Sequence, residues 1–205
     1  MKDTTTLFFD IGGVILTDGW DNKMRSLACR QFDLDLPEFE KAHQLVADLF
    51  ETGQMGLSDY LDRTVFQTSR AFSKADFVEF IRNQSVPNPD TLAVVKRLAG
   101  AGQYLMCTLN NESFELNCYR IAEFGLSKYF TAFFSSCFLG VKKPAPQIYV
   151  RALQITQRLP GECVFIDDRE SNLEQPRLLG MKTIHFRDAG SLCDELSALA
   201  VEVPA

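Results

Sequence analysis

The sequence predicts an α/β fold: a Rossmann-like core of parallel strands, with a small helical cap inserted after the first strand. Leu7–Phe9 form a continuous apolar run, which is typical of a strand buried on both faces. Residues 21–84 carry helical patterns throughout, whereas short apolar strands alternate with helices after Asn88. Such alternation indicates right-handed βαβ units. We therefore divide the chain into an α/β core, residues 1–16 and 88–205, and a helical cap, residues 17–87.

Local signals place the cap helices. Pro37 suits the first position of a helix, whose apolar residues recur at helical spacing until Gly53. Ser58 is expected to open a second helix. Ser73 and Asp76 resemble a capping box at the start of a third.

The core segment continues with a helix that ends at the glycines of residues 100–102 and then with further strands. Strand candidates are QYLMCTL (103–109), AFFSS (132–136), ECVFID (162–167) and KTIHF (182–186). Helices are expected to begin near Glu112, Pro146 and Ser171.

Composition and charge narrow the classes of partner that the protein can have. The chain of 205 residues has 46% hydrophobic residues, 23% charged residues and a net charge of −6. This balance disfavours nucleic acid and anionic membranes as partners. MKDTTT leads directly into the first strand and leaves no room for a signal peptide, and no apolar stretch reaches the roughly 18 residues of a membrane span. We interpret the protein as cytoplasmic, with no indication of its oligomeric state.

Cysteine and histidine usage argues against other kinds of site. The six cysteines are scattered without a CxxC pair, which favours reduced thiols over disulfides or a metal centre. The two histidines, His43 and His185, are too few to favour a zinc site or a Ser/His/Asp triad, and we interpret both as packing or surface residues.

Polar residues cluster where the predicted strands end. In a parallel sheet these ends share one edge, where α/β proteins bind ligands. The residues are Asp10, Thr108, Lys142, Lys143, Asp167 and Asp168. Taken singly, Asp10 could cap a turn and the acidic pair could favour a helix N-terminus. Together they have the makeup of a phosphate and metal site, with carboxylates suited to Mg²⁺.

Four segments resemble, in order, the motifs of the haloacid dehalogenase-like hydrolase superfamily. They are FFDIGG, MCTLNN with its threonine hydroxyl, GVKKPAPQIY and FIDDRESN. The resemblance covers nearly the whole chain, and the insertion lies where this family places a small helical cap. The glycine of the first motif and FETGQMGLSDYL are similar to the branch that contains α-glucose-1-phosphatase. The phosphatase-like domain of soluble epoxide hydrolase is a more distant likeness.

The resemblance implies three catalytic residues. Asp10 would be the nucleophile that forms an aspartyl-phosphate, which water then hydrolyses. Thr108 would bind a phosphoryl oxygen through its hydroxyl. Lys143, directly before Pro144, would neutralise Asp10 and the incoming phosphate, with Lys142 the weaker candidate.

The resemblance also implies Mg²⁺ as cofactor. Its ligands would be Asp10, Asp168 and the backbone carbonyl of Gly12, and Asp167 would support Asp168 or join the set. Asn172 stands where relatives often have another carboxylate. The ion would stabilise charge on the transferring phosphoryl group.

Two positions depart from the family pattern. Gly12 stands where typical phosphatases of the family carry a second Asp, which is the general acid and base. Leu109 in TLNN stands where relatives often show Asn, so the second motif could slip by one residue and favour Asn110 over Thr108. The expected substrate-binding residues are therefore Thr108, Leu109, Asn110 and Lys143.

The leading functional hypothesis is a Mg²⁺-dependent phosphatase that acts on a small phosphorylated metabolite, with a sugar phosphate as one candidate. A second hypothesis is a metal-free 2-haloacid dehalogenase in which Asp10 attacks carbon, although extra carboxylates near an anionic substrate argue against it. A third is a weakly active ligand-binding or interaction module, for which Gly12 is the support.

Overall fold

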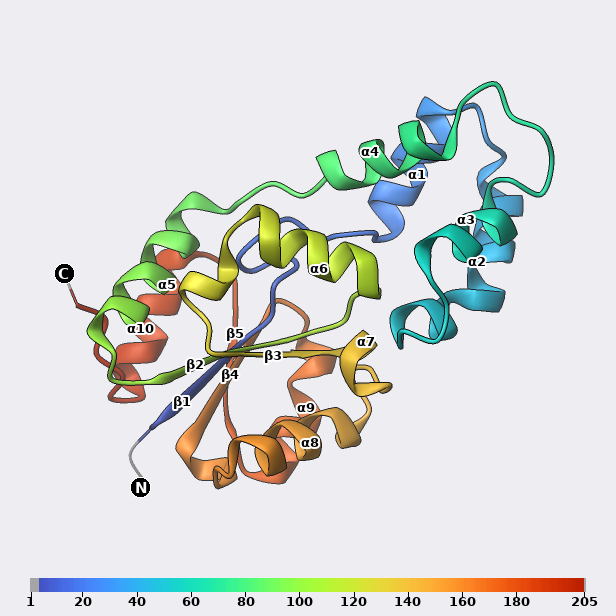
Figure 1. Ribbon diagram of the computed structural model, residues 1–205. Coiled ribbons are helices and arrows are strands. Elements are labelled where there is room, and N and C mark those ends of the chain that lie inside the picture. Colours follow the sequence, from blue (N-terminus) through green and yellow to red (C-terminus); the bar gives the residue numbers. More distant parts are fainter. Residues whose placement is uncertain (1–3, 205) are drawn as a thin grey trace.

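A five-stranded parallel sheet forms the centre of the computed structural model, which describes residues 4–204 (Figure 1). The strands are β1 (Thr6–Phe9), β2 (Leu105–Asn110), β3 (Ala132–Ser135), β4 (Cys163–Asp167) and β5 (Lys182–His185). Their order in the sheet is β3-β2-β1-β4-β5, and every neighbouring pair is parallel. This confirms the predicted α/β, Rossmann-like class. β1 lies at the centre, where the strand order reverses, which is the point at which such sheets bind ligands.

Helices cover both faces of the sheet. Helices α5 (Pro89–Ala101) and α10 (Ala189–Ala198) pack on one face, and α8 (Pro146–Thr156) and α9 (Glu174–Leu179) pack on the other. The remaining core elements are α6 (Phe114–Glu123), α7 (Ser136–Leu139) and three short 3₁₀ turns, η1 (Leu126–Lys128), η2 (Pro160–Glu162) and η3 (Glu170–Asn172). Helix α10 was not predicted from the sequence.

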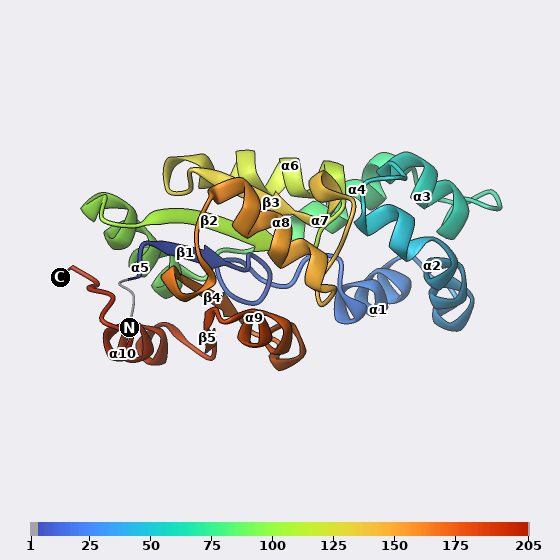
Figure 2. The same cartoon turned by 90° about the horizontal axis from the view of Figure 1, so that it is seen from below.

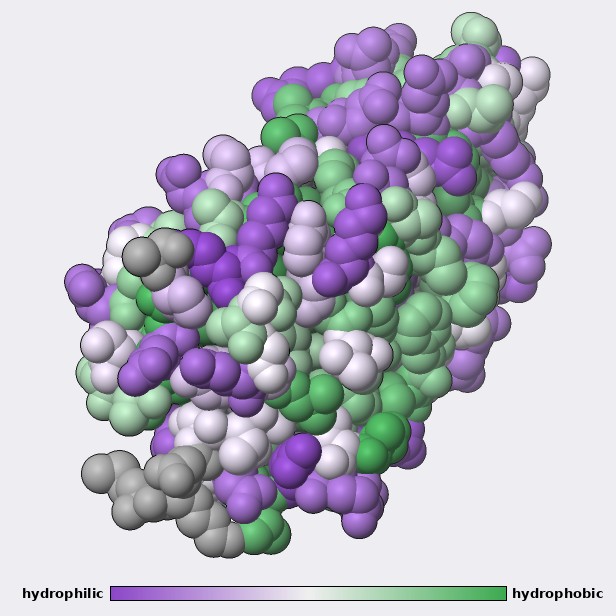
Figure 3. Space-filling view, turned by 60° about the vertical axis from the view of Figure 1, so that its left-hand side comes forward, coloured by the Kyte–Doolittle hydropathy of each residue, from purple (hydrophilic) through white to green (hydrophobic). Residues whose placement is uncertain are grey.

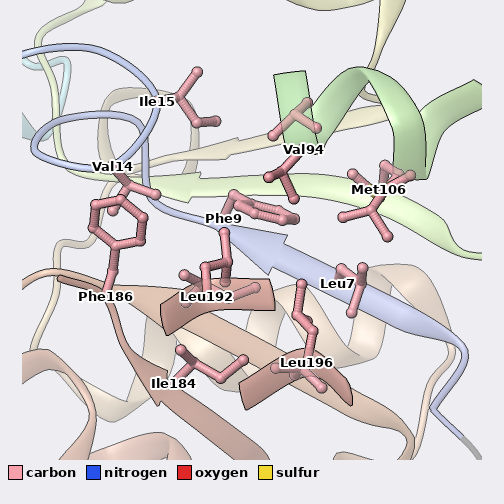
Figure 4. Close-up of a cluster of buried hydrophobic side chains, with 14 of the residues drawn as sticks. Leu7, Phe9, Val14, Ile15, Val94, Met106, Ile184, Phe186, Leu192 and Leu196 are labelled. Atoms are coloured by element: carbon pink, nitrogen blue, oxygen red, sulfur yellow. The ribbon is translucent and has the colours of Figure 1, made fainter. Parts of the chain in front are cut away.

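The central strand is buried on both faces, as predicted. Leu7 and Phe9 pack toward α5 and α10, where Leu192 and Leu196 close the cluster (Figure 4). Phe8 points to the opposite face and packs in the cluster that includes α8 and α9 residues. Because apolar contacts fix β1 from both sides, the residue that follows it is held in a defined position.

Four helices between β1 and α5 form a separate group at one end of the molecule (Figures 1 and 2). They are α1 (Asn22–Gln31), α2 (Leu36–Glu51), α3 (Leu57–Thr64) and α4 (Lys74–Asn83). Trp20, Phe39, Tyr60 and Phe77 lie in an apolar cluster that is largely their own. Leu16 and Pro87 form an antiparallel bridge where the two connecting segments meet the core. The division at residues 17 and 87, which we keep as a proposal, falls in those segments.

Helix starts were predicted with mixed success. The capping box is present, because Ser73 Oγ accepts from the Asp76 backbone N–H at 3.2 Å and Asp76 Oδ2 accepts from the Ser73 N–H at 2.9 Å. The helix predicted to open at Ser58 is present, but it begins one residue earlier, at Leu57 after Gly56, and Ser58 does not cap it. The Leu57 N–H instead donates to Glu115 Oε1 of α6 at 3.0 Å, a tertiary contact that local sequence does not encode.

Helix α2 also starts slightly earlier than predicted. Asp35 caps it by accepting from the Glu38 N–H at 2.7 Å, and Pro37 is the second helical residue rather than the first. All six cysteines are free, in agreement with the sequence analysis.

The surface of the described residues is mixed in character. On the face shown in Figure 3, hydrophilic residues cover most of the upper part, and hydrophobic residues gather lower down on the right. Within residues 4–204, no helix combines the length and apolar character needed to cross a membrane.

Candidate active site

The ends of β1 and β4 and the loop after α7 meet around one buried ammonium group. Lys143 Nζ lies 2.9 Å from Asp10 Oδ2 and 2.6 Å from Asp167 Oδ2, and it also donates to the Leu109 carbonyl at 3.1 Å. Lys143 is 3% exposed, so these contacts replace the water that its charge has lost. Asn111 fixes the lysine backbone, since its side chain accepts from the Lys143 N–H at 2.8 Å and donates to the Lys143 carbonyl at 2.9 Å.

Asp10 is the most strongly perturbed carboxyl of this group. Burial raises its pKa from 3.8 to about 7, and Asp167 and Asp168 add to the rise while Lys143 opposes it. Burial lowers the pKa of Lys143, but Asp10 and Asp167 outweigh this effect and hold it above the usual value. Asp10 Oδ1 accepts from the Ile11 N–H at 2.8 Å, which fixes the carboxylate direction. A group with these properties is suited to react once a cation stabilises its charged form.

Asp167 has a positioning role in this geometry. It is fully buried, and its oxygens already accept from Lys143 Nζ, from the Asn172 amide at 3.0 and 3.1 Å, and from the Arg169 N–H at 2.8 Å. Asn172, which stands where relatives of the resembled family often have a carboxylate, thus serves to hold Asp167. Little lone-pair capacity remains on Asp167 for a metal ion.

Asp168, unlike Asp167, has an oxygen that no protein group in residues 4–204 satisfies. Its Oδ1 atom is buried and has no hydrogen-bond partner, which is costly for a carboxylate unless a ligand completes the site. Burial raises the pKa of Asp168, and Asp167 and Asp18 add to the rise. Carboxylate oxygens of Asp10, Asp167 and Asp168 all lie within 4.8 Å of one another. Because the oxygens of Asp167 are occupied, Asp10 and Asp168, with its unpartnered Oδ1, are the hard oxygen donors of this cluster that fit Mg²⁺.

The glycine pair after β1 allows the backbone to pass close to these carboxylates. Gly13 has φ +71°, and a Cβ atom there would overlap the Asp168 carboxylate. Gly12 has no such restriction. A Cβ atom at Gly12 would lie 3.5 Å from Asp18 Cα, 3.7 Å from Asp18 Oδ1 and 3.8 Å from Arg120 Nη1, all ordinary contacts. A Cβ atom at position 12 would therefore meet no overlap, and position 12 lacks the second carboxylate that typical phosphatases of the family carry.

The second motif is placed differently from the expectation. Thr108 is completely buried, its hydroxyl has no hydrogen-bond partner, and it pairs in register with Phe9 rather than Asp10. The next position, Leu109, packs its side chain in the apolar cluster under α8 and offers only its carbonyl to Lys143. Asn110 is also buried and bonds Asn117 at 3.0 Å. None of these three residues is among those that line the cavity above Asp10, so the structure gives no support to the substrate contacts expected from Thr108, Leu109 and Asn110.

The two neighbouring lysines have different roles. Lys142 turns away from Asp10 and pairs with Asp48 at 2.6 Å and Glu51 at 2.7 Å, both on α2. It joins the core loop to the helical group, whereas Lys143 lies at the centre of the site.

A cavity of about 550 Å³ lies above Asp10, between the sheet and the helical group. From the core it is lined by Asp10, Gly12, Asn111, Glu112, Arg120 and Lys143, and from the helical group by Trp20, Arg25, His43, Phe50 and Glu51, among others. The lining residues from the helices were not predicted from the sequence, because they follow no fixed motif. His43 was interpreted as a packing or surface residue, but it forms part of this wall.

The chain is similar to known hydrolases. A family model of haloacid dehalogenase-like hydrolases matches residues 4–174. Flavin mononucleotide hydrolase 1 of Arabidopsis thaliana is 34% identical over 110 residues, which is 49% of this chain and 45% of that protein. The chain spans less than half the length of the curated relatives that it matches first.

Solved structures share the fold over nearly the full chain. A family enzyme of Bacteroides thetaiotaomicron, solved with magnesium and inorganic phosphate, has a TM-score of 0.73 and 18% identity, and the match covers 90% of this chain and 95% of that one. An L-2-haloacid dehalogenase has a TM-score of 0.67 and 20% identity, covering 95% and 99%. Both a phosphate-binding enzyme and a dehalogenase thus share this fold, so the site must decide between their chemistries.

Proposed function

Because the chain belongs to the haloacid dehalogenase-like hydrolase family, we propose that it is a Mg²⁺-dependent phosphatase acting on a small phosphorylated metabolite. One observation carries the proposal: Asp10, bonded by Lys143, lies beside Asp168, whose buried oxygen has no partner. A carboxylate nucleophile next to an incomplete oxygen site matches the needs of phosphoryl transfer.

The reaction would begin with attack of an Asp10 carboxylate oxygen on phosphorus. The bond between phosphorus and the ester oxygen breaks, the leaving group takes up a proton, and water then hydrolyses the aspartyl-phosphate. Lys143 lies within hydrogen-bond distance of Asp10, so it would neutralise both the nucleophile and the phosphoryl oxygens. Because Thr108 lies outside the cleft, we assign no phosphate contact to its hydroxyl.

The Mg²⁺ ligands would be Asp10, Asp168 and the Gly12 carbonyl. Asp167, whose oxygens are occupied, would orient Lys143 and the loop that carries Asp168. When bound, the ion would supply positive charge that favours ionised Asp10 and offsets the charge of the phosphate.

The acidic cluster also disfavours the dehalogenase hypothesis. Haloacids are carboxylates, and in the described chain Lys143 is already paired with both Asp10 and Asp167. Without a metal ion, such a substrate would meet uncompensated negative charge at Asp168. The similarity to a flavin mononucleotide hydrolase supports a phosphate ester instead. The six free cysteines fit a reducing compartment, and we propose the cytoplasm.

The test is turnover of the purified chain on a panel of phosphate esters and on L-2-chloropropionate, with Mg²⁺ or with EDTA. We expect release of inorganic phosphate that requires Mg²⁺ and is lost in Asp10→Asn. Release of chloride that is indifferent to EDTA would instead establish a dehalogenase. No turnover in either assay would favour a binding module.

A further inference from the structure

A hydrogen-bonded relay inside the helical group ends at the cavity. The Trp20 indole Nε1–H donates to the Tyr60 hydroxyl at 2.8 Å, and the same hydroxyl lies 2.8 Å from His43 Nδ1. Tyr60 is fully buried, and its ring stacks on Phe50 with a centroid distance of 4.0 Å. The three polar groups are therefore fixed against one another.

The relay bears on the protonation of His43. An indole N–H can only donate, so the Tyr60 oxygen is the acceptor in that bond, and its own proton needs another acceptor. We take His43 Nδ1, 2.8 Å away, as the acceptor of that proton, which leaves Nδ1 itself without one. Burial lowers the pKa of His43 to about 4, with Arg25 adding to the effect, so the ring is neutral near pH 7. Its single proton is then on Nε2.

The Nε2–H of His43 has no protein partner in residues 4–204. The ring is 7% exposed, it lines the cavity, and Nδ1 on its other side is bonded to Tyr60. Because His43 lines the cavity and the protein does not satisfy this donor, a ligand atom that accepts from it would gain a hydrogen bond.

The charges around this donor are balanced. Within residues 4–204, each Lys or Arg that lines the cavity is paired with a carboxylate. The pairs are Arg25–Glu40, Arg120–Glu112, Lys142–Glu51, Lys143–Asp10 and Arg169–Asp18. The helical wall therefore offers a neutral donor and aromatic surface from Trp20 and Phe50, but no uncompensated cation for a second anionic group.

We propose that His43 is a specificity-determining residue, whose Nε2–H donates a hydrogen bond to an oxygen of the leaving group and thereby selects neutral, hydroxylated leaving groups such as sugars or polyols. This inference rests on the proposed phosphatase function. Phosphate esters that carry a second phosphate or a carboxylate would be poor substrates, because their extra charge would find no free counterion on this wall.

The first test measures the tautomer and needs no turnover. Because the chain has two histidines, long-range ¹H–¹⁵N NMR spectra at pH 7 can assign His43 by comparison with a His185→Gln sample. We expect a neutral ring with the proton on Nε2, and Tyr60→Phe should allow the other tautomer to appear. A wild-type ring protonated on Nδ1 would overturn the proposal.

The second test compares α-glucose 1-phosphate with phenyl phosphate, whose ring lacks hydroxyls. His43→Leu should lower the kcat/KM for the sugar ester about 10- to 100-fold more than that for phenyl phosphate, because a hydroxyl then loses its partner. His43→Gln, which keeps a donor, should recover part of the loss. Gln44→Leu, an exposed change on the same helix, is the matched control, and thermal unfolding checks the fold of each variant.

The outcomes separate the two proposals. Equal losses on both esters in His43→Leu, with wild type active, would refute the role of His43 alone. Absence of wild-type turnover on these two esters and on the whole panel of phosphate esters would refute the phosphatase function on which that role rests.

Discussion

Asp10→Asn should stabilise the metal-free protein, and the gain should grow as the pH rises. Burial and the neighbouring carboxylates raise the pKa of Asp10 from 3.8 to about 7. A carboxyl whose pKa is higher in the folded state than in the unfolded state favours folding as long as it is protonated. Its contribution to the free energy of unfolding is complete below pH 3.8 and is lost as the pH rises through about 7. The Asn variant has no such titration.

The size of the effect follows from the two pKa values. The difference between 3.8 and about 7, at about 1.4 kcal/mol for each pKa unit, corresponds to about 4 kcal/mol in the free energy of unfolding. About 3 kcal/mol of this falls between pH 5 and pH 8. Asp168 remains in both proteins, so its own titration cancels to first order.

The assay is urea unfolding of wild type and Asp10→Asn in EDTA at several pH values from 5 to 8, with exposed Asp59→Asn as the control. The stability difference should widen with pH and shrink when Mg²⁺ is added, since the ion favours ionised Asp10. The same variant should lose turnover. A stability difference that stays constant within about 0.5 kcal/mol would refute our account of charge burial at Asp10.

Three further substitutions test the metal site and the glycine pair. Asp168→Ala should raise the Mg²⁺ concentration needed for half-maximal turnover at least about tenfold, as measured by metal titration; an unchanged requirement would exclude Asp168 as a ligand. Gly12→Asp should be tolerated structurally, given the contacts of 3.5 Å or more around a Cβ, and should speed esters with poor leaving groups most, by up to about 10² to 10⁴ in single-turnover assays. A flat dependence on leaving-group acidity in wild type would show that another residue donates the proton. Gly13→Ala should lower the free energy of unfolding by at least about 1–2 kcal/mol, because the φ of +71° is left-handed and the new Cβ would overlap Asp168. The same variant should bind Mg²⁺ more weakly. Wild-type stability together with wild-type Mg²⁺ affinity would contradict the geometry.

Residues at the centre of the site were predictable because backbone rules place them. A strand buried on both faces must be apolar throughout, so the charge of Asp10 marks where β1 ends. Asp167 and Asp168 end β4 in the same way, and parallel pairing brings both ends to one edge. Lys143 was preferred over Lys142 through the family resemblance, and the structure places its Nζ between Asp10 and Asp167.

The expectations that the structure does not support concern residues whose role depends on side-chain direction or on tertiary contacts. Thr108 looked like a site hydroxyl, but alternation along β2 turns it away from the cleft, and the register that decides this is set by pairing with β1. Ser58 looked like a helix cap, but Glu115 of α6 satisfies the start of α3. His43 carried no signal because its partners, Trp20 and Tyr60, lie 23 and 17 residues away in the sequence.

The two departures from the family pattern affect the same kind of function. Gly12 follows β1 and Leu109 lies on the neighbouring β2, and both lack a polar side chain that would contact an oxygen of the ester. The groups that hold charge, Asp10, Lys143 and Asp168, are all present. Under the proposed phosphatase function, the charge of the phosphate would still be neutralised, while proton donation to the leaving group has no side chain at position 12. We therefore expect the rate to depend on leaving groups that depart with little protonation, such as the anomeric oxygen of a sugar, and on the helical wall that we propose selects them. A neutral donor at His43 suits that selection, because it can bind a sugar oxygen without adding charge to the cavity.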